Sequence, residues 1–348
     1  MNDLIEKLPG QPNVTFRQFS DYIDIDEKAG RSLFYYFVEA EKDPMNLPLT
    51  IWLTGGPGCG SVGDGFLSVG PFITTANAHG LQRNPYSWIK VTNLLFIDSP
   101  IGAGWSYSNT SSDYEVGDDS TNKDLLTFIL QWFEKYPNFK SRDLYLGGSS
   151  YAGHFIPNFA NTLLDYNKQS TSFKFNIKGL ALGNPLLRNK LDTLAVYDFF
   201  WSRGMININL HQQILKECNG IDEDNYSNNA TKWKSGLKYS DVDKDIDMIP
   251  ALKKILQQSI PITIFSGDQD AIVPTVGTLN HVNKLAKDMK LNLTKDEAWN
   301  HENKGGGWMY SYGNLLTYMT VKGANHHVTF SKPSEALFIF TNIAYKKP

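Results

Sequence analysis

The 348-residue sequence has only two cysteines, Cys59 and Cys218, so it can form at most one disulfide bridge. Long apolar runs are missing as well, since none approaches the roughly 18 residues that a membrane-spanning helix needs. Residues 1–7 also lack the apolar core of a secretory signal. Positive charge is not concentrated, because 33 basic residues stand against 36 acidic ones, with a net charge of -3 and no basic tail. These absences exclude a disulfide scaffold and predict neither a membrane nor a nucleic-acid partner.

What is present is the composition of a sizeable globular protein. Hydrophobic residues make up 41% of the chain and charged residues 20%, which excludes wholesale disorder. A chain of this length can build one large α/β domain or two average ones without disulfides. No fixed-period repeat is visible, so a solenoid is not expected.

Short apolar runs alternate with helical patterns along most of the chain. The runs predicted as strands cover residues 49–53, 94–98, 144–146, 177–182, 262–265 and 316–321. Apolar residues at spacings of three and four predict an amphipathic helix over 121–136, and a second one from Phe155 to Leu164. Strands that alternate with helices favour an α/β fold with a mostly parallel sheet covered on both faces.

Residues 185–245 break this alternation. They are polar and irregular, with a stretch rich in Asn and Asp near 219–230. We interpret them as a partly helical cap inserted over the sheet, with a plain surface excursion as the alternative. Residues 1–184 and 246–348 then form the core.

A run of small residues between the third predicted strand and its helix can carry a nucleophile. The sequence Gly148-Ser149-Ser150-Tyr151-Ala152-Gly153 suits a strained strand-to-helix turn that exposes a serine at the edge of the sheet. The usual pattern has glycine two residues before and after the serine, and Ala152 stands in the second place. The alternative is an ordinary helix start capped by Ser149.

Acidic and histidine residues follow two later strands, in the order serine, acid, histidine that α/β-hydrolases use. Asp268 and Asp270 come after one strand, and His326 and His327 after the last. Adjacent histidines can suggest a metal, but neighbouring side chains diverge on most backbones and no Cys or acid lies near them in the sequence. We therefore expect no metal and no cofactor, and we interpret His154 as a packed or capping residue.

With these residues in place, the chain resembles the serine carboxypeptidase family, in its plant serine carboxypeptidase-like branch, over nearly its whole length. The blocks that carry the resemblance are residues 8–12 (Leu-Pro-Gly-Gln-Pro), 52–59 (Trp-Leu-Thr-Gly-Gly-Pro-Gly-Cys), 98–107 (Asp-Ser-Pro-Ile-Gly-Ala-Gly-Trp-Ser-Tyr), 148–154, 179–185 (Gly-Leu-Ala-Leu-Gly-Asn-Pro), 267–270 and 323–326 (Gly-Ala-Asn-His).

The resemblance implies an α/β-hydrolase fold with a Ser-His-Asp triad. In that family pattern Ser150 is the nucleophile, His326 the base and Asp270 the residue that orients the base. The backbone N–H groups of Gly56 and Tyr151 would form the oxyanion hole. These roles fit the chemistry, because a serine hydroxyl attacks only when an imidazole takes its proton.

The chain departs from the peptide-cleaving members of the family at the positions that hold a substrate's C-terminal carboxylate. Those members use an Asn and two Glu residues, where this chain has Thr54, Ser68 and Ser149. With Gly55 of the same loop, these residues make up the predicted substrate-binding set. Hydroxyl groups can still donate hydrogen bonds to an anion, so recognition of a carboxylate is expected to be weakened. Thr54 resembles the family's acyltransferase branch, which moves acyl groups from glucose esters; a decayed carboxypeptidase is the alternative.

The cysteines depart from the family as well. Plant relatives have three disulfides, one of which joins the cysteine at position 59 to a cysteine late in the cap. Residues 232–237 contain no such cysteine, and Cys218 lacks its usual neighbour, so both thiols are predicted to be free. The cap is also shorter than in relatives, between about 219 and 231. The resemblance implies the secretory pathway or vacuole, whereas missing disulfides equally fit a reducing, cytosolic compartment.

Three functions remain open from the sequence. The first is an acyl-enzyme catalyst that transfers or hydrolyses the acyl group of a small-molecule ester. The second is a serine carboxypeptidase that releases C-terminal residues from peptides. The third is a lyase or a non-catalytic binding protein, which an intact triad argues against.

Overall fold

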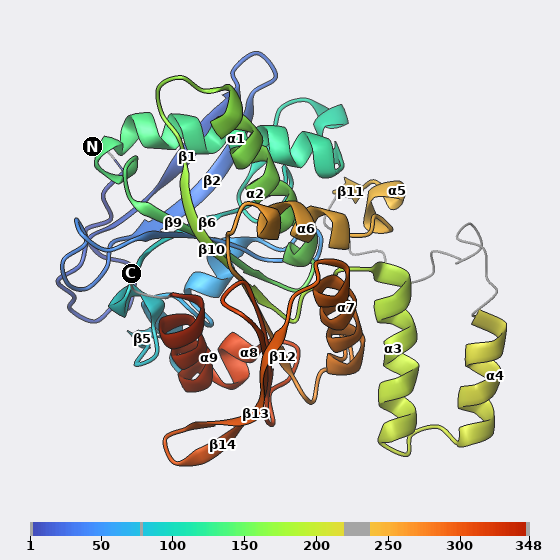
Figure 1. Ribbon diagram of the computed structural model, residues 1–348. Helices are drawn as coiled ribbons and strands as arrows, with labels where there is room; N and C mark the ends of the chain where they lie inside the picture. The colour runs from blue at the N-terminus through green and yellow to red at the C-terminus, as the bar shows by residue number, and fades with distance from the viewer. Residues whose placement is uncertain (1–2, 77–78, 219–236, 346–348) are drawn as a thin grey trace.

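The computed structural model describes residues 3–76, 79–218 and 237–345 (Figure 1). In this part of the chain, one eleven-stranded sheet runs in the order β1-β2-β6-β3-β9-β10-β12-β15-β14-β13, and β7 pairs with β2. Its strands are β1 (Gln18–Asp26), β2 (Arg31–Val38), β3 (Leu49–Leu53), β6 (Asn93–Ile97), β7 (Tyr107–Ser108), β9 (Asp143–Ser149), β10 (Asn176–Gly183), β12 (Ile262–Gly267), β13 (Leu293–His301), β14 (Lys304–Tyr312) and β15 (Leu316–Val321). Two small sheets pair β4 (Phe72–Thr74) with β5 (Leu81–Arg83) and β8 (Glu115–Val116) with β11 (Lys238–Tyr239).

The middle of the large sheet is parallel and its two ends are antiparallel. Strands β6, β3, β9, β10, β12 and β15 are paired in parallel, and all six coincide with strands predicted from the sequence. The α/β-hydrolase fold is therefore confirmed. The antiparallel strands β1, β2, β13 and β14 were not predicted.

The helices are α1 (Asp118–Lys135), α2 (Ala152–Gln169), α3 (Asn189–Ser202), α4 (Ile208–Cys218), α5 (Asp241–Lys244), α6 (Ile249–Gln257), α7 (Thr275–Asp288), α8 (Val328–Ser331) and α9 (Pro333–Ile339). Both predicted helices are confirmed as α1 and α2. The first starts three residues early, where the Ser120 hydroxyl accepts a hydrogen bond from the Gly117 N–H at 3.0 Å and closes the first turn. No helix in the described ranges is long and apolar enough to cross a membrane.

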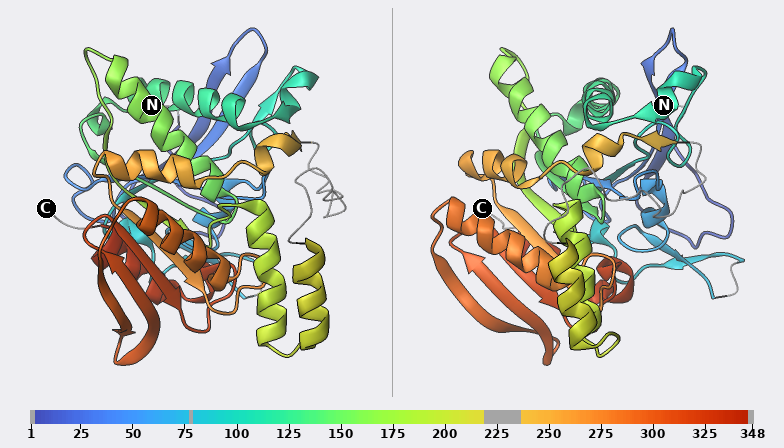
Figure 2. Two further views of the ribbon diagram at one scale, coloured as in Figure 1. Left: turned by 45° about the vertical axis from the view of Figure 1, so that its right-hand side comes forward. Right: turned by 90° about the vertical axis from the view of Figure 1, so that its right-hand side faces the viewer.

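Each central strand contributes side chains to two separate hydrophobic cores, because successive side chains of a strand point to opposite faces. On β3, Ile51 and Leu53 belong to the core under α1, α2, α6 and α7, whereas Trp52 belongs to the core on the other face. That second core is closed by the segment around Trp88 and by the C-terminal helices, with Trp88 stacked on Phe340 at 4.1 Å between ring centroids. Figure 2 shows α1, α2 and α6 gathered beside the sheet. The sheet is thus covered on both faces, as predicted.

Residues 185–245 contain α3, α4, β11 and α5, so the described part of this segment is helical to a large extent. Helix α3 lies beside α7, α4 lies on the other side of α3, and both project from the body of the molecule (Figure 1). A buried hydrogen bond of 2.8 Å joins Asp192 of α3 to His281 of α7 and fixes this arrangement. Residues 219–236, including the predicted shortened stretch, lie outside the described residues. The division into core and cap remains a prediction.

A buried carboxyl group on α1 makes the stability of the fold depend on pH. Asp124 is 6% exposed, and an Arg31 nitrogen lies 3.4 Å from its side chain. Burial outweighs this ion pair and raises the pKa of Asp124 to about 6. Because this value lies above that of an unfolded Asp, about 4, the group stabilises the fold while protonated. That contribution is lost as the pH rises through about 6.

We expect Asp124→Asn to stabilise the protein at neutral and alkaline pH, because the amide cannot ionise. The gain in unfolding free energy should be about 1–2 kcal/mol larger at about pH 8 than at about pH 5. Urea unfolding at the two pH values measures it. The control is Asp119→Asn, which removes an exposed acid from the same helix and should give no pH-dependent gain. A loss of stability at pH 8 would show that the Arg31 ion pair outweighs burial.

Candidate active site

The predicted site residues meet at one edge of the sheet. Ser150 follows β9, Asp270 follows β12 and His326 follows β15, and these three strands run parallel to one another through β10. Parallel strands end on the same side, and in open α/β sheets that carboxyl edge is where ligands bind. The fold therefore brings together residues that are 176 positions apart in the chain.

Ser150 occupies the strand-to-helix turn that the sequence predicted. It has a φ of 62°, a left-handed conformation that costs energy for a residue with a side chain. The turn needs small neighbours, because a Cβ added to Gly148 would lie 2.6 Å from the Cβ of Ala152. Ser150 is partly exposed while Ser149 is buried, and α2 has no side-chain cap at its start. The exposed hydroxyl of the turn is thus that of Ser150.

A chain of two hydrogen bonds joins the serine, the histidine and one of the two acids. The Nε2 atom of His326 lies 2.9 Å from Ser150 Oγ, and its Nδ1 atom lies 2.8 Å from Asp270 Oδ2. Since Asp270 only accepts, Nδ1 carries the proton and Nε2 is left to accept from the serine hydroxyl. Asp268 is turned away and accepts from the Gly323 N–H at 2.7 Å. This geometry is what proton transfer from the serine requires.

Asp270 is held by three further hydrogen bonds that the sequence analysis did not foresee. The side-chain amide of Asn184 donates to Oδ2 at 2.5 Å, and the N–H groups of Ile272 and Val273 donate to Oδ1 at 2.7 and 3.1 Å. Asn184 follows β10, between the nucleophile strand and the strand before Asp270. Every hydrogen bond that this carboxylate makes to the described residues comes from a donor, so its orientation is fixed. The sequence feature that could have indicated Asn184 is the block Gly183-Asn184-Pro185, which resembles the family.

The loop after β3 lies directly against the nucleophile turn. A Cβ added to Gly55 would stand 2.3 Å from the Tyr151 nitrogen and 2.9 Å from the Ser149 carbonyl oxygen, so only glycine allows this approach. Gly56 has a φ of +119°. Within the described residues, neither the Gly56 nor the Tyr151 N–H donates to a protein acceptor. Two unused donors beside the nucleophile suit an oxyanion hole.

Two of the predicted substrate-binding residues, Thr54 and Ser68, donate hydrogen bonds to an acidic residue that the sequence analysis missed. Asp64 Oδ2 accepts hydrogen bonds from Thr54 Oγ1 at 2.5 Å and from Trp52 Nε1 at 2.8 Å. The Ser68 hydroxyl points to the same segment and donates to the Asp64 carbonyl oxygen at 3.3 Å. Ser149 is buried next to the nucleophile. The sequence feature that could have indicated Asp64 is its place between two glycines, Gly63-Asp64-Gly65. This feature is not specific, because acids are common in turns.

The charge of Asp64 is felt by two further side chains of the site. Burial raises the pKa of the Cys59 thiol, and Asp64 adds to that rise. Burial lowers the pKa of His327, with a further lowering from His326, while Asp64 and Asp270 act in the opposite direction. His327 is therefore neutral near pH 7 and supplies no positive charge here. His154, by contrast, is fully buried and stacks on Tyr151 at 4.7 Å, as expected for a packed residue.

A buried aspartate holds the segment that carries Asp64. Asp98, at the end of β6, accepts hydrogen bonds from the N–H groups of Val62 and Trp105, both at 3.0 Å. Its pKa is raised by burial. A Cβ added to Gly104 would stand 2.0 Å from its Oδ2, which explains the small residues of that loop. The short helix Ser61–Gly65 is thus anchored to the end of a central strand.

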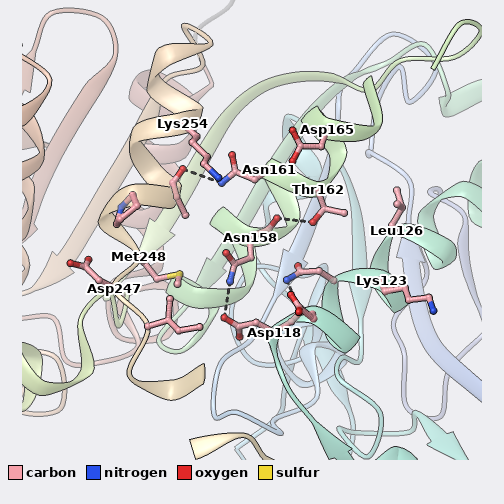
Figure 3. Close-up of a pocket in the computed structure, with 15 residues that line it drawn as sticks. Asp118, Lys123, Leu126, Asn158, Asn161, Thr162, Asp165, Asp247, Met248 and Lys254 are labelled. Carbon is pink, nitrogen blue, oxygen red and sulfur yellow. Dashed lines mark hydrogen bonds between the residues drawn. The ribbon is translucent and has the colours of Figure 1, made fainter. Parts of the chain in front are cut away.

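A separate cleft of about 590 Å³ opens between α1, α2 and α6 (Figure 3). It contains none of the predicted site residues. Its polar groups largely satisfy one another, since Asn158 donates to Asp118 at 2.9 Å and Asn161 donates to the Ala251 carbonyl at 3.1 Å. We therefore assign the candidate site to the carboxyl edge of the sheet.

The thiol state of Cys59 can be tested directly. Cys59 is a free, half-buried thiol, whereas the side chain of Cys218 lies outside the described residues. Because burial raises its pKa, Cys59 should react with iodoacetamide at least about tenfold more slowly in the folded protein than in denaturant. Intact-mass measurements follow the reaction. We expect two alkylated cysteines in denaturant and one in Cys59→Ser; a Cys59–Cys218 bridge would contradict this and indicate an oxidising compartment.

The fold, with a serine, a histidine and an aspartate hydrogen-bonded at the carboxyl edge of its sheet, is that of an α/β-hydrolase. The serine carboxypeptidase family model matches residues 9–241 and 221–345. The chain is 44% identical to "Serine carboxypeptidase-like 44" and 43% identical to "Serine carboxypeptidase-like 42", both from Arabidopsis thaliana, over 98% of this chain and 90% of each relative. The chain therefore belongs to the serine carboxypeptidase family and is a hydrolase-type enzyme.

A solved structure agrees with this assignment at the level of the fold. The prohormone-processing carboxypeptidase Kex1(delta)p of Saccharomyces cerevisiae superposes with a TM-score of 0.76 at 22% identity, over 94% of this chain and 91% of that one. The alignment with the first Arabidopsis relative extends over 429 positions, more than the 348 residues of this chain. That relative therefore has insertions that this chain lacks. The two matched family segments overlap over residues 221–241, in the region where the sequence predicted a shorter cap.

Proposed function

We propose that this protein forms an acyl-enzyme on Ser150 from a small-molecule ester and passes the acyl group to an alcohol or to water. The observation that carries the proposal is the hydrogen-bonded order Ser150–His326–Asp270, with distances of 2.9 and 2.8 Å, beside the unused N–H groups of Gly56 and Tyr151. Peptide or small-molecule substrates both fit the family. The residues around the triad favour the ester.

In the first half of the reaction, His326 Nε2 takes the hydroxyl proton as Ser150 Oγ attacks the ester carbonyl. A bond forms between Oγ and the carbonyl carbon, and the negative charge moves to the carbonyl oxygen. When the carbon–oxygen bond to the alcohol breaks, His326 returns the proton to the leaving alcohol. In the second half, an acceptor alcohol or water gives its proton to His326 and attacks the acyl carbon; as the bond from that carbon to Oγ breaks, His326 passes the proton to Ser150 Oγ, which restores the serine.

The remaining residues would stabilise the charges that develop during the reaction. The two N–H groups of Gly56 and Tyr151 would receive the developing oxyanion, and losing one such donor typically costs about 3 kcal/mol. Asp270 would stabilise the imidazolium of His326 during each transfer. Asn184 would act through Asp270, since it touches that carboxylate.

A carboxypeptidase is the second candidate, because the Arabidopsis relatives are named serine carboxypeptidase-like proteins. It would need donors for the C-terminal carboxylate of a peptide. The single hydroxyl hydrogen of Thr54 is already used on Asp64, and Ser68 donates to a backbone oxygen. The set that family members use for a carboxylate therefore lacks free donors at two of its three positions, which supports the ester.

Intact-mass spectrometry after rapid mixing tests the proposal. We expect an acyl adduct on Ser150 with neutral glucose esters, and little release of C-terminal residues from blocked dipeptides. Ser150→Ala should form no adduct. Ser149→Ala keeps the nucleophile and should still form it, which makes it the matched control for the register of the turn. Efficient dipeptide cleavage, at roughly 1–1000 turnovers per second, would favour the carboxypeptidase instead.

A further inference from the structure

An acidic side chain occupies the place where peptide-cleaving relatives are expected to hold a carboxylate. Asp64 lies in the short helix Ser61–Gly65 that follows the oxyanion loop. Its Oδ2 atom accepts from Thr54 and Trp52. Its Oδ1 atom accepts no hydrogen bond from the described residues, and the side chain is partly exposed. One carboxylate oxygen is thus left for a ligand.

The donors of this region point at Asp64 and away from any incoming anion. Thr54 has one hydroxyl hydrogen and Trp52 has one indole N–H, and both are used on the same oxygen. Ser68 donates to the backbone of Asp64 itself. A ligand that reaches this place therefore meets an acceptor, and it must bring the hydrogen-bond donor or the positive charge.

Nothing close by in the described residues neutralises this acid. No salt bridge between residues that the structure describes includes Asp64. His327, on which the charge of Asp64 acts, is kept neutral by burial, and the other side chain on which it acts, Cys59, is a thiol. Two like charges about 4 Å apart repel strongly enough, at the dielectric of a protein surface, to weaken binding by at least about tenfold.

We propose that Asp64 sets the specificity of this subsite, so that the enzyme takes esters whose alcohol portion is cationic or a neutral hydrogen-bond donor, and rejects those whose alcohol portion carries a carboxylate. This rests on the proposed function, because it concerns the leaving alcohol of an ester that acylates Ser150. Because positions 54, 68 and 149 carry hydroxyl residues in this chain, Asp64 is the binding residue that determines which alcohol portion is accepted.

The test uses three esters that share one acyl group and differ in the charge of a small alcohol: the benzoate esters of choline, glycolamide and glycolate. In the unaltered enzyme, we expect kcat/KM for the choline and glycolamide esters to exceed that for the glycolate ester by at least about tenfold. Asp64→Asn keeps the shape and removes the charge. It should lower the choline-to-glycolate ratio by at least about tenfold.

Two further variants separate charge from structure. Thr54→Val removes one hydrogen bond to Asp64 but keeps the acid, so the order of the three esters should remain. Asp165→Asn removes the same net charge from the exposed side of α2, 13 residues and therefore about 20 Å along the helix from its start. It should leave the ratio unchanged. Melting temperatures of all variants report whether they fold.

A binding experiment without turnover should give the same preference for choline over glycolate independently. Saturation-transfer NMR with choline and glycolate on Ser150→Ala should detect choline at lower concentration than glycolate, and Asp64→Asn in that background should remove the difference. If Ser150 forms an adduct but glycolate is bound and turned over as well as choline, the role of Asp64 is refuted and the proposed function stands. If no adduct forms on Ser150 but choline is preferred in the binding experiment, the proposed function fails and the subsite remains.

Discussion

Replacing Asp270 with Asn is expected to lower kcat on a neutral ester by roughly 10⁴-fold, the loss seen when the acid of a Ser-His-Asp triad becomes an amide. The reason lies in the four donors that surround this carboxylate. His326 and Asn184 donate to one oxygen, and the N–H groups of Ile272 and Val273 donate to the other. The amide nitrogen of Asn must therefore face a donor in either orientation.

Each orientation damages a different part of the site. If the nitrogen faces His326, the imidazole adopts the other tautomer and Nε2 can no longer accept the proton of the serine. If it faces residues 272 and 273, the N–H groups of both residues lose their acceptor. Steady-state kinetics and the rate of adduct formation on Ser150 measure the loss. Asp268→Asn is the matched control, since that acid bonds to the Gly323 N–H and not to the imidazole; equal losses in the two variants would contradict the assignment.

Gly55→Ala is expected to lower kcat by roughly 10²–10³-fold, the effect of losing an oxyanion-hole donor. The new methyl group would stand 2.3 Å from the Tyr151 nitrogen and 2.9 Å from Ser149 O and Ser150 Cβ. These atoms belong to the backbone and nucleophile of the strained turn, so the loop must move and carry Gly56 away from the carbonyl oxygen. Overpacking of this kind also costs about 1–3 kcal/mol of stability.

The matched control is Gly63→Ala, eight residues further along the same segment. A Cβ added to Gly63 meets no atom within 4 Å, so this variant should fold and retain the ester reaction. Adduct formation on Ser150 and urea unfolding are measured for both variants. Full activity in Gly55→Ala would show that the loop does not supply an oxyanion donor.

The central strands could be predicted from the sequence because a parallel strand is buried on both faces and therefore appears as a continuous apolar run. β3 is the clearest case, with all five residues buried. β13 gave no such signal. It lies at the edge of the sheet, and its run Leu-Thr-Lys-Asp-Glu-Ala is exposed, as is usual for strands that avoid pairing with another chain.

The residues of the candidate site also differ in whether the sequence could predict them. Ser150, Asp270 and His326 could be found because each follows a predicted strand, within blocks that resemble a known family. Asp64 and Asn184 could not, because their importance lies in what they touch: a turn acid becomes a binding group only when Thr54 and Trp52 donate to it. The loss of the family's acids was visible in the sequence, and the hydrogen bonds that hold Asp64 in this region were not.

Trp52 belongs both to the interior and to the subsite. Its ring is fully buried and packs edge-on against Trp88, with 5.2 Å between the ring centroids, while its indole N–H reaches Asp64. Substituting such a residue by a small one costs about 3–5 kcal/mol, a large share of the stability of any domain. We therefore expect that the specificity of this subsite can be changed at the smaller residues of positions 54 and 64, whereas Trp52 has to be kept as the support that holds Asp64.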